Sequence, residues 1–355
     1  MEQNTKIKNL ELYSYLTIIT TGILFLIYIG SNIIFPIIFA FYGALLLLPL
    51  VKKLRKIGFN HFWSCFSVVT TTFLSLFLIG YLLSFQGIKV VNQFTDDSQT
   101  NQIKPKEMIE EAVNDATETV NMSTADKKKT TNGLIDKIVS VSGEYFGVFF
   151  NGIQETLIFF LITPIYLFFM LFYRSNLNEF IQKRSSKENQ TQNLKILMSI
   201  SIMAQKYLKG LGIVIIIVSI LNTITLIVFG ISNPLFLGVI SGVLIIIPYI
   251  GVAIGGAVPT IIALITKDTY WIAIGVASSY AFVQFLEGNF ITPKIIGDST
   301  DLNPLVIIIG MIVLGALGGI LAMIVAIPLL ASLKILLDNS DNFGEFQILM
   351  KNNLD

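Results

Sequence analysis

The chain has 355 residues, of which 54% are hydrophobic and 13% are charged, and its mean hydropathy is +0.74. Soluble domains carry about 25% charged residues, so this composition excludes an ordinary soluble protein. The 24 basic and 23 acidic residues nearly cancel and give no net attraction to nucleic acid. The single cysteine, Cys65, excludes an internal disulfide, and with one histidine the chain has too few ligands for a zinc site of paired Cys and His.

Several stretches without a charged residue exceed the roughly 18 residues that suggest a transmembrane helix. They cover residues 12–51, 57–88, 156–173, 235–266 and 302–333. The sequence therefore predicts an all-α polytopic membrane protein with about eight hydrophobic segments.

The N-terminal part, residues 1–85, is predicted to hold three spans. The first, about 12–29, is followed by a second apolar run without a cleavage site, so we expect it to be retained rather than removed as a signal peptide. Gly30-Ser31-Asn32 predicts a turn before the second span, about 33–51. Four basic residues and no acid lie between Val51 and Phe62, which places this loop and the N-terminus in the cytoplasm.

A polar insert follows the third span, about 62–85, and is predicted to cover residues 86–147. Up to Glu144 it holds seven lysines and ten acidic residues, a net charge of −3 that suits the external face. Apolar residues at helical spacing from Met108 to Val120, and a capping-box pattern at Ser123 and Asp126, predict two amphipathic helices. We expect their apolar stripes to pack on each other, on lipid headgroups or on a neighbouring subunit rather than to bind a ligand.

The remaining membrane part, residues 148–337, begins with a fourth span near 148–173 and precedes a polar tail, residues 338–355. The stretch from Arg174 to Gly210 holds seven basic and two acidic residues, which predicts a cytoplasmic location. A fifth span is expected near 211–231.

Two later hydrophobic segments, 235–266 and 302–333, are each 32 residues long. As straight helices they would measure about 48 Å, against a hydrocarbon core of about 30 Å. Glycines and prolines interrupt both, and both start from an Asn-Pro-Leu tripeptide, at Asn233 and at Asn303. Broken helices in corresponding positions point to a transporter binding region, whereas the alternative is a long tilted helix with glycines for close packing. The sequence leaves open whether these segments cross the membrane or re-enter it.

Four blocks of the sequence resemble the autoinducer-2 exporter family, also called PerM-like permeases. They are Tyr207-Leu208-Lys209-Gly210, Ile247-Pro248-Tyr249-Ile250-Gly251, the run from Gln284-Phe285-Leu286-Glu287-Gly288-Asn289 to Gly297, and Leu302-Asn303-Pro304-Leu305 leading to Ala326-Ile327-Pro328. The resemblance implies export of autoinducer-2 or, as for some members, exchange of sodium or lithium for protons. It also implies a homo-oligomer such as a pentamer. One departure is Leu211, where the family commonly has Gln, so no polar role is expected there.

Glu287 is the leading candidate for a functional side chain, because a carboxylate within a membrane segment is costly unless it is paired or hydrated. Gln284 lies three residues earlier on the same helix face, and Asn289 follows in the same stretch. We expect these residues to bind a solute or to couple proton movement. The structural alternative is that Glu287 pairs with Lys294 or caps backbone amides near Pro293.

Other residues are expected to shape the backbone or line the pathway. Asn222, Thr223 and Thr225 of the fifth span either line a pathway or form hydrogen bonds between helices. The helix-break and hinge positions are Pro248, Gly251, Pro293, Gly297, Pro304 and Pro328.

Taken together, these features predict a transporter rather than an enzyme, with no catalytic residue, cofactor or metal. A GxxxxGK[ST] loop is absent from the sequence, so we expect a secondary transporter or permease driven by a gradient. It would lie in the bacterial plasma membrane and move a small hydrophilic molecule, or a monovalent cation in exchange for protons. The alternative is a non-transporting receptor or assembly scaffold that acts through its external helices.

Overall fold

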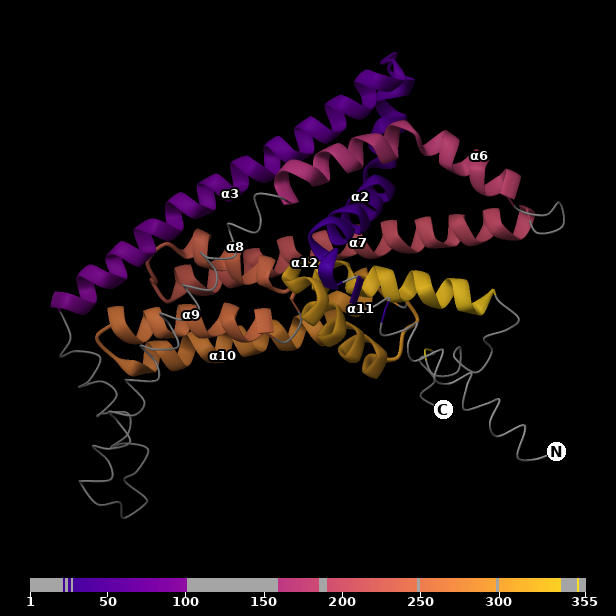
Figure 1. Ribbon diagram of the computed structural model, residues 1–355. Helices are drawn as coiled ribbons and strands as arrows, with labels where there is room; N and C mark the ends of the chain where they lie inside the picture. Colours follow the sequence, from indigo (N-terminus) through magenta and orange to yellow (C-terminus); the bar gives the residue numbers. More distant parts are fainter. Residues whose placement is uncertain are drawn as a thin grey trace, which may run out of the picture. The chain divides into compact units, whose positions relative to one another are not determined.

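The computed structural model describes residues 28–100, 159–184, 190–247, 250–297 and 300–339, together with a few residues before 28 and Met350. All regular elements within these ranges are helices (Figure 1), so the predicted all-α class is confirmed. The two amphipathic helices expected in the polar insert, and most of the polar tail, lie outside the described residues.

Four helical stretches among the described residues are long and apolar enough to cross a membrane. A fifth is added if the helix Phe159–Phe172 and the first turns of α6 (Arg174–Arg184), which bend by 62° at their junction, count as one span. The described part of the chain is thus a multi-pass membrane protein, although these ranges do not supply the eight spans expected. The four are Ser31–Lys56, His61–Gly87, Thr191–Val228 and Leu321–Asp338.

The turn expected at Gly30-Ser31-Asn32 is a one-residue irregularity before α2 (Ser31–Lys56). Gly30 has φ −87° and ψ 6°, its amide donates to the Leu26 carbonyl, and its own carbonyl accepts from the Ile34 amide. Helical hydrogen bonding therefore continues through the glycine.

Two helices extend well beyond the spans expected from the sequence. Helix α3 (His61–Thr100) has 40 residues, a length of about 60 Å, and continues past residue 85 into the polar stretch. Helix α7 (Gln190–Val228) includes much of the basic stretch that precedes the fifth span. Helix α7 extends this far because its basic stretch also carries an apolar stripe with helical spacing: Ile200, Met203, Ala204 and Tyr207 are all buried.

The chain forms two compact units, and each is described separately below. The first contains residues 1–70, 157–205 and 299–355. In it, the Tyr42 hydroxyl of α2 donates to the Pro328 carbonyl at 3.0 Å and lies 2.8 Å from Ser332 Oγ. Pro328, one of the predicted helix-break positions, is thus buried in a helix, where its carbonyl accepts hydrogen bonds.

In the same unit, α12 (Pro304–Asp338) is two helical arms rather than one helix. Gly318 and Gly319 leave helical geometry between the arms, with φ −143° and ψ 18° for Gly318 and φ 63° and ψ −152° for Gly319. The latter conformation is essentially open only to glycine. The chain therefore reverses at this pair.

Contacts between the arms of α12 show that they run antiparallel. A Cβ atom added at Gly310 would meet Leu330, and one added at Gly315 would meet Met323, so each pair lies in close contact. At the open end, Lys334 Nζ lies 3.1 Å from Asp301, which precedes the first arm.

The second unit, residues 71–156 and 206–298, contains a similar hairpin made of α8 (Pro234–Leu244) and α9 (Ile250–Thr266). Ser241 Oγ lies 2.7 Å from the Gly255 carbonyl, which joins the two helices across the hairpin. At the open end, Lys267 Nζ donates to the Gly230 carbonyl at 2.5 Å. The arms therefore run antiparallel here as well.

The two segments that the sequence left undecided thus both fold back on themselves. Each hairpin starts at the proline of an Asn-Pro-Leu tripeptide, Pro234 or Pro304, the favoured position for proline in a helix. Helix α8 has 11 residues, about 16 Å, which is too short to cross a hydrocarbon core of about 30 Å.

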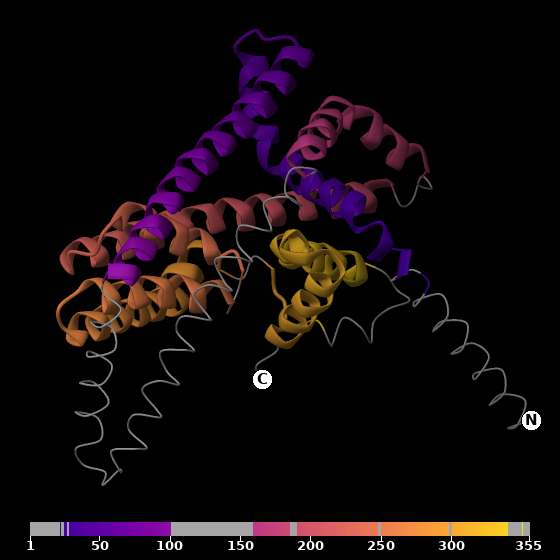
Figure 2. The same ribbon diagram turned by 60° about the vertical axis from the view of Figure 1, so that its left-hand side comes forward.

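The second unit continues from the hairpin into α10 (Tyr270–Leu286), a π-helical turn η1 (Glu287–Ile291) and α11 (Thr292–Ile295). Helices α9 and α10 lie side by side in both ribbon views (Figures 1 and 2). Their shared core includes Leu226 of α7, Leu237 of α8, Ile262 of α9 and Val276 of α10.

We expect Gly319→Ala to lower the thermal stability of the detergent-solubilised protein, because alanine is strained by about 1–3 kcal/mol in this conformation. Gly80→Ala is the matched control, since a Cβ at this helical glycine of α3 would meet no atom within 4 Å. Thermal unfolding measured for both variants checks the prediction. A Gly319→Ala protein at least as stable as the control would show that the hairpin turn does not depend on this glycine.

Candidate functional site

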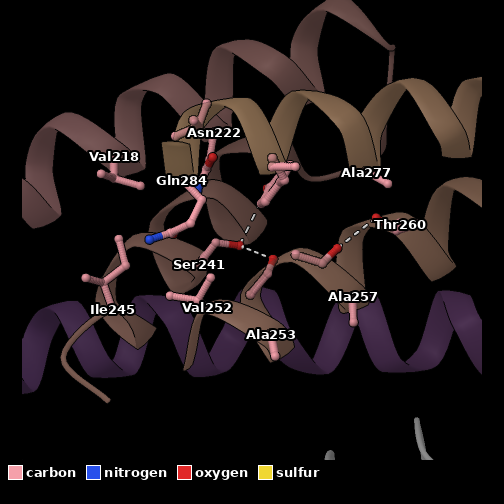
Figure 3. A pocket seen from close by; sticks show the side chains of 15 residues that line it. Val218, Asn222, Ser241, Ile245, Val252, Ala253, Ala257, Thr260, Ala277 and Gln284 are labelled. Carbon is pink, nitrogen blue, oxygen red and sulfur yellow. Dashed lines mark hydrogen bonds between the residues drawn. The ribbon is translucent and has the colours of Figure 1, made fainter. Parts of the chain in front are cut away.

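A cavity of about 500 Å³ lies within the second unit, between α7, α8, α9 and α10. Most of its wall is made of small apolar residues (Figure 3). No formally charged side chain is among the residues that line it. The polar side chains of the wall are Asn222, Ser241, Thr260, Tyr280 and Gln284.

Asn222 of α7 is the polar residue of this pocket that lacks a partner. Its side chain is 4% exposed, and its Oδ1 atom forms no hydrogen bond with any described residue. Leaving a buried acceptor unsatisfied costs about 1–3 kcal/mol. An acceptor held at this cost beside an open cavity is suited to a hydrogen-bond donor that enters from outside the chain.

Unlike the Asn222 amide oxygen, the hydroxyl groups of the pocket already have partners within the chain. Ser241 Oγ lies 2.7 Å from the carbonyls of both Leu237 and Gly255, and 3.5 Å from the Tyr280 hydroxyl. Thr260 Oγ1 donates to the Gly256 carbonyl of its own helix at 2.8 Å. The bonds between residues of the wall are drawn in Figure 3. The bond between Ser241 and the Gly255 carbonyl joins α8 to α9.

Two glycines of α8 bring this helix against α7 and so bring Asn222 and Ser241 to one cavity. A Cβ added at Gly238 would come within 2.1 Å of Thr223 Oγ1, and one added at Gly242 within 2.1 Å of Ser219 Oγ. This is the close approach that a Gly-x-x-x-Gly pattern allows between helices. Thr223 Oγ1 donates to the Ser219 carbonyl of α7, so it satisfies its own helix.

Glu287 begins the π-helical turn directly after α10 and is 8% exposed. Gln284 Nε2 donates to Glu287 Oε2 at 2.6 Å, and the Thr292 hydroxyl donates to Oε1. The carboxylate thus has a donor on each oxygen. Among the described residues its polar partners are these two side chains, whereas Lys294 is exposed and is not one of them.

Pro293 explains why the helix widens at this point. Proline has no amide hydrogen, and its ring clashes with the carbonyl four residues earlier, here that of Asn289. In the turn before it, the Thr292 amide bonds to the Glu287 carbonyl, the i→i−5 pattern of a π-helix. Such turns often occur at functional sites.

The structure brings together two of the three residues proposed from the sequence. Gln284 contacts Glu287 and also lines the pocket. Asn289 is exposed, and its Nδ2 donates to the Phe285 carbonyl at 2.9 Å. Sequence reasoning missed Ser241 and Tyr280; for Ser241 the Gly238-x-x-x-Gly242 spacing was the available signal, whereas no local signal pointed to Tyr280.

The predicted hinge positions have varied surroundings. Gly251 lies against the Leu244 carbonyl at the turn of the α8–α9 hairpin, and Gly297 follows α11 with φ 55°. Pro304 begins α12, where the Asn303 side chain accepts from the Leu305 amide. Pro248 lies outside the described residues.

Helices long enough to span a membrane, two helical hairpins and a neutral polar cavity together define a multi-pass membrane protein of the transporter class. A family model described as AI-2E family transporter matches residues 16–342. The chain belongs to this family, and the resemblance noted in the sequence is confirmed.

Individual relatives support the same assignment. YrrI of Bacillus subtilis, named as a transport protein, is 29% identical over 315 residues, which cover 86% of each chain. PerM of Escherichia coli, named as a permease, is 24% identical over 324 residues, or 87% of this chain and 88% of PerM. The AI-2 transport protein TqsA of Escherichia coli is 27% identical over 113 residues, or 32% of this chain and 33% of TqsA.

We expect Asn222→Leu to leave the thermal stability unchanged or to raise it by up to about 2 kcal/mol, because the variant removes an unsatisfied buried acceptor. Ser241→Ala is the contrasting variant and should lower stability by about 1 kcal/mol, since its hydroxyl is bonded across the hairpin. Thermal unfolding in the same detergent compares them. Equal destabilisation by both variants would mean that Asn222 has a structural partner.

Proposed function

We propose that this protein is a secondary transporter that carries a small, neutral, hydroxyl-bearing molecule through the pocket between α7 and α10. The observation that supports this most is the unpartnered Asn222 Oδ1 beside the cavity. A hydroxyl of a solute would satisfy it, and the uncharged wall would not favour a solute that carries a net charge. The name of TqsA makes an autoinducer-2-like signal the first solute to examine.

A second candidate is exchange of a monovalent cation, such as sodium or lithium, for protons. Glu287 supports this alternative, since it is a carboxylate beside the pocket that can bind a proton or a cation. For either function we propose a bacterial plasma-membrane location, a cytoplasmic N-terminus and a homo-oligomer. The scaffold alternative rests on the external insert and gains no support from the pocket.

Flux into proteoliposomes, measured for autoinducer-2, glycerol, sodium, lithium and protons, tests the proposal. We expect a hydroxylated solute to move and Asn222→Leu to reduce its flux at least about threefold, the effect of losing one hydrogen bond of roughly 0.7 kcal/mol or more. Thr223→Val is the matched control on the same helix, because the Thr223 hydroxyl is bonded to its own backbone.

The outcome separates the two candidates. Sodium or lithium flux coupled to protons, with no movement of a hydroxylated solute, would favour cation exchange. Unchanged flux of the hydroxylated solute in a folded Asn222→Leu protein would remove the pocket from the pathway.

Thiol labelling of intact cells tests the proposed orientation. In a Cys65→Ser background, a cysteine at exposed Ile57, next to the basic loop, should be shielded from a membrane-impermeant reagent. A cysteine at Asp115 of the polar insert should react. Labelling at residue 57 from outside would reverse the orientation.

A further inference from the structure

The Gln284 side chain lies between the pocket and the Glu287 carboxyl group. It lines the pocket that also contains Asn222, and its Nε2 atom donates to Glu287 Oε2 at 2.6 Å. The residue thus connects a solute-sized cavity to a buried carboxyl group. Its two terminal atoms differ in kind, since the nitrogen only donates and the oxygen only accepts.

The protonation state of Glu287 decides which amide atom it can bind. An ionised carboxylate only accepts, so it holds the Gln284 nitrogen, and the amide oxygen remains for the pocket. The pocket then offers two acceptors, Gln284 Oε1 and Asn222 Oδ1, which suits a hydroxylated solute. A protonated carboxyl carries an O–H that needs an acceptor, and the Gln284 oxygen can supply it after the amide turns about its terminal bond.

We propose that Gln284 is the positioning residue that couples protonation of Glu287 to solute binding in the pocket. When Glu287 takes up a proton, the Gln284 amide turns, its oxygen accepts from the carboxyl and its nitrogen faces the pocket. The pocket exchanges an acceptor for a donor, which can bind Asn222 Oδ1 and displace the solute. This inference rests on the proposed function and adds proton coupling to it.

Few titratable or charged side chains lie near Glu287 among the described residues. Tyr280 lies on α10, exposed Lys294 lies on α11, and α7 packs against α11 at Gly210, next to exposed Lys206 and Lys209 and buried Tyr207. In the described part of the chain, none of these side chains bonds to the carboxyl group. The other partner, Thr292, has a hydroxyl oxygen that could also accept a hydrogen bond from the protonated carboxyl group, so the test must distinguish it from Gln284.

Infrared difference spectra between pH 8 and pH 3.5, recorded on the full chain in lipid vesicles, test the coupling without a solute. We expect a protonated carboxyl band that is lost in Glu287→Gln. A shift of a glutamine side-chain amide band should accompany it and be lost in the near-isosteric Gln284→Met. Labelling of glutamine with ¹³C shows that this band in the unsubstituted protein comes from a glutamine side chain, and loss of its pH dependence in Glu287→Gln links it to the Glu287 carboxyl group even if Gln284→Met does not fold.

Two further variants complete the test. Thr292→Val should retain the amide shift, because the proposal assigns the acceptor role to Gln284. Asn289→Ala is the matched control in the same turn and should retain both bands, since its side chain bonds to the Phe285 carbonyl. A Glu287 carboxyl band without any amide shift, a shift that persists in Gln284→Met, or no Glu287 titration would each overturn the coupling. Solute flux through the pocket would be unaffected by that failure, which separates it from failure of the proposed function.

Discussion

The need to pair every backbone N–H and C=O group away from water is the constraint on which this structure depends. In a bilayer an unpaired group costs several kcal/mol, so a broken helix is tolerated only where protein covers the break. Close packing at glycine covers both hairpins with protein. Gly310 and Gly315 admit the second arm of α12, and Gly238 and Gly242 admit α7 against α8.

The pocket follows from the same packing. With α8 held against α7 by its glycines, Asn222 shares a cavity with Ser241 and Tyr280, whose own hydrogen bonds remain within the chain. Among the described side chains of the second unit, Asn222 is the one whose buried polar atom lacks a hydrogen-bond partner. Such an exception is costly, and binding of a solute is the physical compensation that we propose for it.

The sequence predicted features that depend on local spacing, and it missed those that depend on contacts between distant residues. Length, glycine and proline revealed that 235–266 and 302–333 are broken, but the reversal of 302–333 depends on the positive φ of Gly319 and on packing between distant residues. The spacing of Gln284 and Glu287 predicted that they share a helix face, and in the structure the two side chains are hydrogen-bonded. It did not predict that Asn289 points elsewhere, because the π-helical turn caused by Pro293 changes the angle between successive side chains. The meeting of Asn222 with Ser241 requires helix packing that no local pattern encodes.

Chemical blockage of the pocket tests its role in transport most directly. Ala257 lines the cavity and is exposed, so in a Cys65→Ser background Ala257→Cys should react with a small methanethiosulfonate reagent. Ser278→Cys, exposed on α10 and outside the pocket wall, is the control. We predict that complete modification at position 257, verified by mass spectrometry, abolishes solute flux, whereas modification at 278 leaves it intact. Full flux after complete modification at 257 would contradict transport through this pocket.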